Sequence, residues 1–160
     1  PSRCVIDMSV DTMARLFELK NIVGVKDATG DPNRIDQTLK KLGPDFIQLT
    51  GEDGFALEFN KRGGVGIISV TANIAPKLCS DFQKYSKSKT DNEIKEAEKI
   101  DQILQPIHKS LFIESNPAPV KHAAKLLGLC GDEIRLPLVK IKKETEDQVK
   151  KVLLSAKLLS

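Results

Sequence analysis

The chain has 160 residues, of which 40% are hydrophobic and 29% are charged, and its net charge is only +3. This length suits one domain or a large piece of one, and the composition provides for a buried core and excludes a disordered chain. A nucleic-acid-binding surface is not indicated. The basic residues are spread along the chain apart from a lysine-rich tail, and one tyrosine with no tryptophan leaves little for base stacking.

The cysteines and histidines do not form a metal-binding pattern. Cys4, Cys79 and Cys130 are far apart and lack the close spacing of a zinc or disulfide framework. Reduced thiols in a cytosolic protein are therefore the simpler interpretation. His108 and His122 have no second ligand at useful spacing, so we expect helix-surface or packing roles and no bound metal. No apolar run reaches the length of a membrane span.

The first half of the chain alternates helices with short apolar strands. Ser9 caps the first predicted helix, Asp31 caps the second and Pro76 opens the fourth. In chain order, we expect a helix over 9–19, a buried strand over 22–25, a helix over 31–43, a strand over 46–49, a helix over 55–63, a continuous apolar strand over 65–70 and a helix from 76. Three parallel βα units follow, and we expect the strand that precedes the first helix to lie before residue 1.

From about Thr90 the pattern changes to helices only. We expect helices over 91–112, 120–127 and 142–159, the last one charged and amphipathic. The chain is therefore divided into an α/β part, residues 1–90, and a C-terminal α-helical region, residues 91–160, in which no second chemistry is indicated.

Lys26 is the strongest candidate for a catalytic group. It ends the predicted strand over 22–25 and precedes a glycine-containing turn, and the active sites of parallel α/β proteins gather at that edge. In an apolar layer the ammonium form is costly to desolvate, which favours a neutral, nucleophilic amine. Spacing alone leaves an equal alternative, in which the lysine reaches solvent or pairs with Asp27.

Three further residues could contribute to the same site. Gly51 and Ile68 lie at or near the ends of the next two predicted strands, where a small residue allows a substrate to approach the backbone. Arg3 lies in a predicted loop, and its guanidinium could bind a carboxylate in a bidentate way. Without Lys26, ordinary turn geometry would be strongly favoured for Gly51 and Ile68, and a surface arginine is the better explanation of Arg3 taken alone.

Five blocks of sequence carry a family resemblance. In order they are PSR at 1–3, GVKDATG at 24–30, TGED at 50–53, GGVGIISVTAN at 63–73 and NPAPVK at 116–121. Together they resemble the dihydrodipicolinate synthases, and the GVKDATG block resembles the Schiff-base strand of the wider pyruvate-dependent class I aldolases. The match runs from Pro1 to about Leu138.

The resemblance implies a fold, a reaction and roles for single residues. The fold would be the C-terminal part of a (β/α)8 TIM barrel, followed by C-terminal helices. The reaction would be the condensation of pyruvate with aspartate semialdehyde in lysine (diaminopimelate) biosynthesis, with no cofactor, by a cytoplasmic homo-oligomer, a tetramer in the family. Lys26 would form the imine, and Arg3 would help to bind the substrate carboxylate. Gly51 would line the pyruvate pocket, and the carbonyl of Ile68 would lie near the active lysine.

The family also has features that precede residue 1 of this sequence. They include the first barrel strands and the tyrosine and threonine of the proton relay, for which Tyr85 is no substitute. We therefore expect this chain to be the C-terminal half of the enzyme and to pair with an N-terminal half. Two alternatives stay open: another pyruvate-dependent aldolase, lyase or dehydratase on the same scaffold, and a non-catalytic half-barrel subunit.

Overall fold

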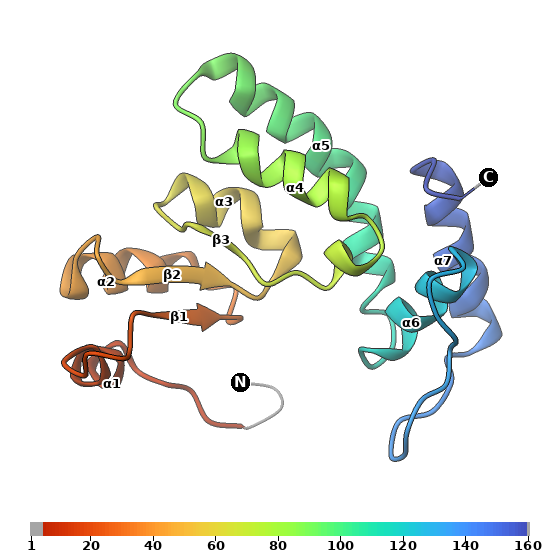
Figure 1. Ribbon diagram of the computed structural model, residues 1–160, viewed down its shortest axis with the longest axis horizontal. Coiled ribbons are helices and arrows are strands. Elements are labelled where there is room, and N and C mark those ends of the chain that lie inside the picture. The colour runs from red at the N-terminus through yellow and green to blue at the C-terminus, as the bar shows by residue number, and fades with distance from the viewer. Residues whose placement is uncertain (1–4, 160) are drawn as a thin grey trace. The chain divides into compact units, whose positions relative to one another are not determined.

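The computed structural model describes residues 5–159 of the chain (Figure 1). The chain divides into two compact units, here called the strand unit, up to Ile68, and the helical unit, from Ser69. The described elements of the strand unit are α1 (Val10–Phe17), β1 (Gly24–Asp27), α2 (Pro32–Leu42), β2 (Ile47–Thr50), the 3-10 turn η1 (Asp53–Phe55), α3 (Ala56–Lys61) and β3 (Gly66–Ile67). Those of the helical unit are η2 (Thr71–Asn73), α4 (Pro76–Ser86), α5 (Asp91–Ser110), α6 (Ala118–Leu126) and α7 (Lys143–Ser155).

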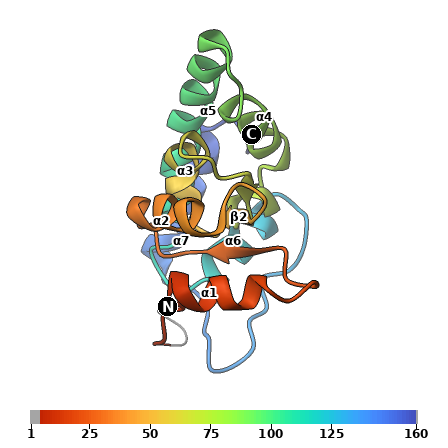
Figure 2. The ribbon, with the colours of Figure 1, turned by 90° about the vertical axis from the view of Figure 1, so that its left-hand side faces the viewer.

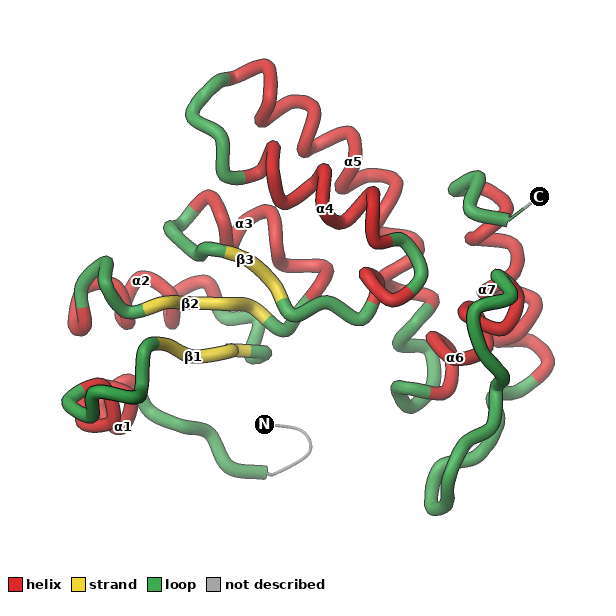
Figure 3. The backbone as a smooth tube through the Cα atoms, viewed as in Figure 1, coloured by secondary structure: helices red, strands yellow, loops and turns green. Residues whose placement is uncertain are grey.

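A parallel sheet in the order β1-β2-β3 forms the centre of the strand unit (Figure 3). Lys26 of β1 pairs with Leu49 of β2, and Leu49 pairs with Gly66 of β3. This confirms the parallel arrangement that the alternating pattern predicted. The third strand is shorter than expected, because its ladder covers two residues in place of the whole segment 65–70.

The local signals at the helix ends behave as the sequence predicts. The Ser9 side chain accepts a hydrogen bond from the Thr12 N–H at 3.1 Å, and that of Asp31 accepts one from the Asn33 N–H at 2.9 Å. Helix α2 ends at Gly43, whose φ of 82° lies in the left-handed region that glycine adopts easily. Figure 2 shows α1, α2 and α3 rising in that order, and Figure 1 shows the same order for β1, β2 and β3.

The two faces of the sheet are treated differently, because side chains alternate along each strand. On one face of β2, Gln48 and Thr50 are 5% and 1% exposed, and the Gln48 amide donates to the carbonyl of Ile35 in α2 at 3.3 Å. On the other face, Ile47 is 42% exposed. We call this second side the open face. Helices therefore cover the side with polar residues and leave an apolar side open.

The expectation that the strand over 22–25 is buried is wrong for the described chain. Val23 is 61% exposed, Val25 is only half-buried and Lys26 is exposed. The residues have the apolar, β-branched character of a buried strand, but burial also needs a second layer. Among the described residues of the strand unit, no second layer covers the open face of β1.

The helical unit buries a continuous apolar core. Five residues are each 1% exposed or less: Leu104 and Ile107 in the last two turns of α5, Leu111 just after it, and Val149 and Leu153 of α7. These positions recur at the three- and four-residue spacing of one helix face. The helices predicted over 91–112, 120–127 and 142–159 are thus present, with ends shifted by a few residues.

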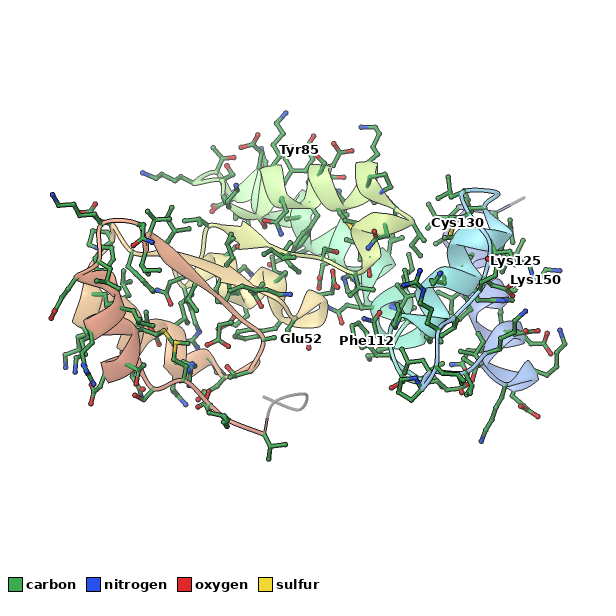
Figure 4. The ribbon with its side chains drawn as sticks, turned by 60° about the horizontal axis from the view of Figure 1, so that its bottom comes forward. Glu52, Tyr85, Phe112, Lys125, Cys130 and Lys150 are labelled. Atoms are coloured by element: carbon green, nitrogen blue, oxygen red, sulfur yellow. The ribbon has the colours of Figure 1, made fainter. Side chains whose placement is uncertain are left out.

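The two histidines are packing residues and do not lie on helix surfaces. His108 of α5 is 6% exposed and His122 of α6 is 9% exposed. The Thr71 hydroxyl lies 2.6 Å from His108 Nδ1, so this ring ties α5 to η2. Tyr85, labelled in Figure 4, lies on α4 as expected.

Neither a membrane-spanning helix nor a metal-binding cluster is found in the described part of the chain. No helix within residues 5–159 combines the length and the apolar character that a membrane crossing requires. In that same part of the chain, no three His, Cys, Asp or Glu side chains come together in a way that could hold a metal ion.

Candidate functional site

Lys26 lies in the third position of β1, near the carboxyl end of the strand. Because its neighbours Val25 and Asp27 point to the helix-covered side, the Lys26 side chain belongs to the open face. It is exposed there, as in the alternative in which the lysine reaches solvent and not as in an enclosing apolar layer. The position of the amine at a strand end is as expected, and the apolar layer that would enclose it is not formed within the strand unit.

Gly51 lies directly under the side chain of Lys26. A Cβ atom at position 51 would come within 2.5 Å of Lys26 Cε and 3.0 Å of Ala28 Cβ. The Gly51 N–H donates to the carbonyl of Asp27 at 2.6 Å and so continues the ladder beyond β2. A side chain at this position would occupy the space that the lysine uses, which is a physical reason for glycine here.

Ile68 lies in the corresponding place after β3. Its N–H donates to the carbonyl of Thr50 at 2.9 Å, which extends the pairing between β2 and β3 by one residue. Its side chain is 49% exposed. Since the carboxyl ends of parallel strands share one edge, the structure brings Lys26, Gly51 and Ile68 to the same edge and the same face of the sheet.

Arg3 lies outside the described residues, so its predicted position is not tested. The segment that follows it lies next to β1. A shallow pocket of about 200 Å³ is lined by Ile6, Asp7 and Met8 from this segment, by residues 25–29 including Lys26 across from it, and by Met13 and Arg34. A pocket of this size could hold only a small molecule.

The sequence analysis missed a charged cluster behind Lys26. Nε of Arg34, in α2, lies 2.5 Å from Oδ2 of Asp27, and both side chains are less than 15% exposed. Oδ1 of Asp27 accepts from the N–H and the hydroxyl of Thr29, at 2.7 and 2.6 Å. Asp27 therefore has partners other than Lys26. The only signal in the sequence was Asp27 next to the lysine, with Arg34 in the first turn of the following helix.

A larger cavity lies in the helical unit but does not combine the features of a reactive site. It has a volume of about 760 Å³ and lies between α5 and α7, with Ile103, Pro106 and Val152 among its lining residues. Its Asp147 is paired with Lys143 at 3.0 Å, and the hydroxyl of Ser155 donates to a backbone carbonyl of its own helix. These contacts are ordinary for an exposed helix surface.

Fold and site together define an α/β protein with a lysine-centred candidate site at the carboxyl edge of a parallel sheet. A model of the dihydrodipicolinate synthetase family matches residues 1–156, and the chain belongs to this family. It is 71% identical over 159 residues to the 4-hydroxy-tetrahydrodipicolinate synthase of Pelagibacter ubique, covering 99% of this chain and 54% of that protein.

Solved structures agree with this assignment. The dihydrodipicolinate synthase of Aquifex aeolicus superposes with a TM-score of 0.93 at 37% identity, over 99% of this chain and 53% of that one. A chloride-inhibited synthase from Acinetobacter baumannii, solved in complex with pyruvate, gives 0.89 at 38% identity, over 96% of this chain and 52% of that one. The α/β fold is therefore the one found in these enzymes, and the chain spans about half the length of the relatives it matches.

Proposed function

We propose that this chain is the C-terminal half of a 4-hydroxy-tetrahydrodipicolinate synthase, a lyase that condenses pyruvate with aspartate semialdehyde in lysine (diaminopimelate) biosynthesis. One observation carries the proposal: the Lys26 side chain lies over Gly51 at the carboxyl edge of the parallel sheet, in a chain that belongs to this family. The pyruvate complex of the Acinetobacter baumannii relative supports pyruvate as the first substrate.

Lys26 is the residue that forms the Schiff base. Its neutral amine attacks the ketone carbon of pyruvate, and the adduct loses water to give a protonated imine. The imine draws electrons from the methyl group, which loses a proton to give an enamine. The enamine carbon then forms a bond to the aldehyde carbon of aspartate semialdehyde, whose oxygen takes up a proton.

The other site residues hold the small oxo-acid. Gly51 leaves space beside the lysine stem, and the backbone at Ile68 lies at the same edge. Arg3 binds the carboxylate of the incoming substrate through its guanidinium fork. Proton transfer belongs to groups outside this sequence, and positioned acid–base groups contribute about 10²–10⁴ in rate. This half alone is therefore slow even where it forms the imine.

Besides its substrates, we propose that the chain binds the N-terminal half of the barrel. In this proposal residues 1–90 form the C-terminal part of the (β/α)8 barrel and residues 91–160 an added helical region. The exposed apolar side chains Ile47 and Ile68 on the open face support it, because a barrel interior would enclose them. We further propose a cytoplasmic homotetramer, by analogy with the family.

Borohydride trapping tests the function directly. The chain with its N-terminal half is incubated with pyruvate and borohydride, and the adduct is mapped by mass spectrometry. We expect one adduct, on Lys26, which Lys26→Ala and Lys26→Arg both remove; the arginine variant keeps the charge and loses the nucleophile. Removal of a covalent nucleophile lowers turnover by on the order of 10³-fold or more. An adduct on another lysine, or none in the wild type, would rule out this mechanism.

Arg3 provides a second test within the same enzyme. Arg3→Ala should lower kcat/KM for the condensation and leave the trapping of pyruvate on Lys26 in place, because its proposed role is carboxylate binding and not imine chemistry. Unchanged kinetics with both substrates would contradict that role.

A further inference from the structure

Arg34 of α2 connects two parts of the strand unit that lie on either side of the pocket at Lys26. Its Nη1 lies 2.7 Å from Oδ2 of Asp7, and its Nη2 donates to the carbonyl of Met8, in the segment that follows Arg3. Its Nε lies 2.5 Å from Oδ2 of Asp27, at the end of β1. One guanidinium thus reaches both walls of the pocket.

The connection to β1 fixes the backbone that carries the lysine. Asp27 follows Lys26 directly, and its carboxylate is held by Arg34 on one oxygen and by Thr29 on the other. The carbonyl of Asp27 accepts from the Gly51 N–H at 2.6 Å. Because side chains alternate along a strand, Asp27 faces the helices while Lys26 faces the opposite side. Arg34 therefore acts on the lysine through the strand and does not touch the amine.

The contacts of Arg34 with Asp7 and Met8 hold the N-terminal segment in place as the opposite wall of the pocket. Ile6, Asp7 and Met8 line the pocket opposite β1, and two of these three residues are bound by Arg34. The Arg34 side chain is 13% exposed and that of Asp27 is 14% exposed, so their ion pair is shielded from solvent, whereas the pair with Asp7, which is 55% exposed, is not. Arginine suits this place because its rigid fork donates hydrogen bonds to Asp7 and to the carbonyl of Met8, while its Nε, which makes no hydrogen bond, forms the ion pair with Asp27.

We propose that Arg34 is a positioning residue for imine formation at Lys26. It fixes the distance between the segment 6–8 and the end of β1, and this distance sets the width of the pocket in which a small 2-oxo acid would bind. The proposal rests on the proposed function, because the effect is measured through trapping of pyruvate on Lys26. A purely structural ion pair would lower stability and leave the pyruvate dependence of trapping unchanged.

The test compares four variants of the complete enzyme. Arg34→Met removes both connections, Arg34→Lys keeps the charge and loses the fork, and Asp7→Asn weakens only the connection to the N-terminal segment. Arg62→Met is the matched control. Arg62 bridges two carboxylates in the same unit, Asp36 and Glu58, at 2.6 Å each, and lies outside the residues that line the pocket.

The readout is the initial rate of borohydride trapping as a function of pyruvate concentration, measured on protein shown to be folded by its unfolding midpoint. For Asp7→Asn we expect the half-saturating concentration to rise about two- to fivefold at an unchanged maximal rate, since an ion pair this exposed is weak. For Arg34→Met we expect the maximal rate to fall about ten- to a hundredfold as well, because small misplacements of reacting groups are costly. Arg34→Lys should lie between these two, and Arg62→Met should match the wild type.

The outcomes separate this inference from the function on which it rests. A wild type that forms no pyruvate adduct on Lys26 refutes the proposed function. A wild type that forms the adduct, with Arg34→Met and Arg62→Met alike in both kinetic parameters, overturns the role of Arg34. If Arg34→Met does not fold, the test rests on Asp7→Asn and Arg34→Lys. A half-saturating pyruvate concentration equal to that of the wild type in both variants overturns the proposal.

Discussion

The two units of the chain bury their apolar residues in opposite ways. In the helical unit, the core residues Leu104, Ile107 and Leu153 are each 1% exposed or less. In the strand unit, the open face of the sheet keeps Ile47 and Ile68 at 42% and 49% exposure. The helical unit therefore has a closed core between its helices although loop residues such as Leu136 stay exposed, whereas in the strand unit one whole face of the sheet keeps apolar side chains that one more layer would bury.

The polar residues of the sheet strengthen this comparison. Gln48 and Thr50 are buried against the helices, at 5% and 1% exposure, although polar residues normally lie on the solvent side of a half-covered sheet. The arrangement has a simple explanation if the open face is the interior of a barrel. The comparison teaches that a strand can have a buried character in its sequence and still be exposed in one piece of the structure.

The largest expected effect concerns residues 1–160 produced by themselves. Open strand edges and an apolar face favour association with other chains, so we expect aggregation or self-association and no significant condensation activity. Sedimentation, binding of an apolar dye and turnover would be measured with and without the N-terminal half. A soluble monomer that unfolds cooperatively and has full activity would contradict both the comparison and the assignment as a half-enzyme.

Single core truncations sharpen the comparison. Leu104→Ala should destabilise the protein by about 2–5 kcal/mol, because it leaves a cavity in a closed core. Ile103→Ala, on the same helix at 43% exposure, is the matched control and should cost less than about 1 kcal/mol. Denaturant unfolding measures both, and equal losses would show that the core of the helical unit is not where the structure places it.

Ile47→Ala applies the same measurement to the open face. In the complete enzyme we expect a loss of about 1–3 kcal/mol, since the barrel would bury this side chain. A loss below about 1 kcal/mol, as expected for the exposed Ile103, would mean that the open face stays open.

Gly51→Ala tests the space under Lys26. The added Cβ would lie 2.5 Å from Lys26 Cε, so the end of the lysine must move and trapping of pyruvate should fall by about tenfold or more. Gly43→Ala is the control, because its φ of 82° strains a side chain although no neighbouring atom lies within 4 Å. We expect that control to lose stability and keep trapping. A Gly51→Ala enzyme with the wild-type trapping rate would show that the lysine stem does not need this space in the active form.

The smallest expected effect is electrostatic and lies in the helical unit. Lys125 and Lys140 hold the pKa of Asp132 down, from an ordinary value of 3.8 to about 2, with the hydrogen bond from Lys125 as the main cause. A lowered carboxyl pKa contributes stability above pH 4, and that contribution is lost as the pH falls toward 2.

Melting temperatures between pH 6 and 2 measure this effect in the wild type and in Asp132→Asn. The variant should be slightly less stable at pH 6, and the difference should shrink at low pH. Asp31→Asn would not serve as a control, because it alters a helix cap; Asp45→Asn, at an exposed loop position, is suitable. A difference that stays constant with pH would contradict the role of the two lysines.

The features that could be predicted from the sequence depend on interactions between residues that are close in the chain. The caps at Ser9 and Asp31, the opening of α4 at Pro76 and the order of strands and helices depend on near neighbours in the chain, and the structure has them where the sequence put them. The shared edge of Lys26, Gly51 and Ile68 also followed from the sequence, because parallel strands must end together.

The sequence by itself therefore determined the elements, their parallel order and the edge at which a lysine site would lie. Only the tertiary structure decided that Arg34 binds Asp27 and the segment at Asp7, that His108 is buried against Thr71, and that the sheet keeps one face open. The physical reason is that elements form from contacts close in sequence, whereas ion pairs and burial depend on residues that folding brings together from far apart.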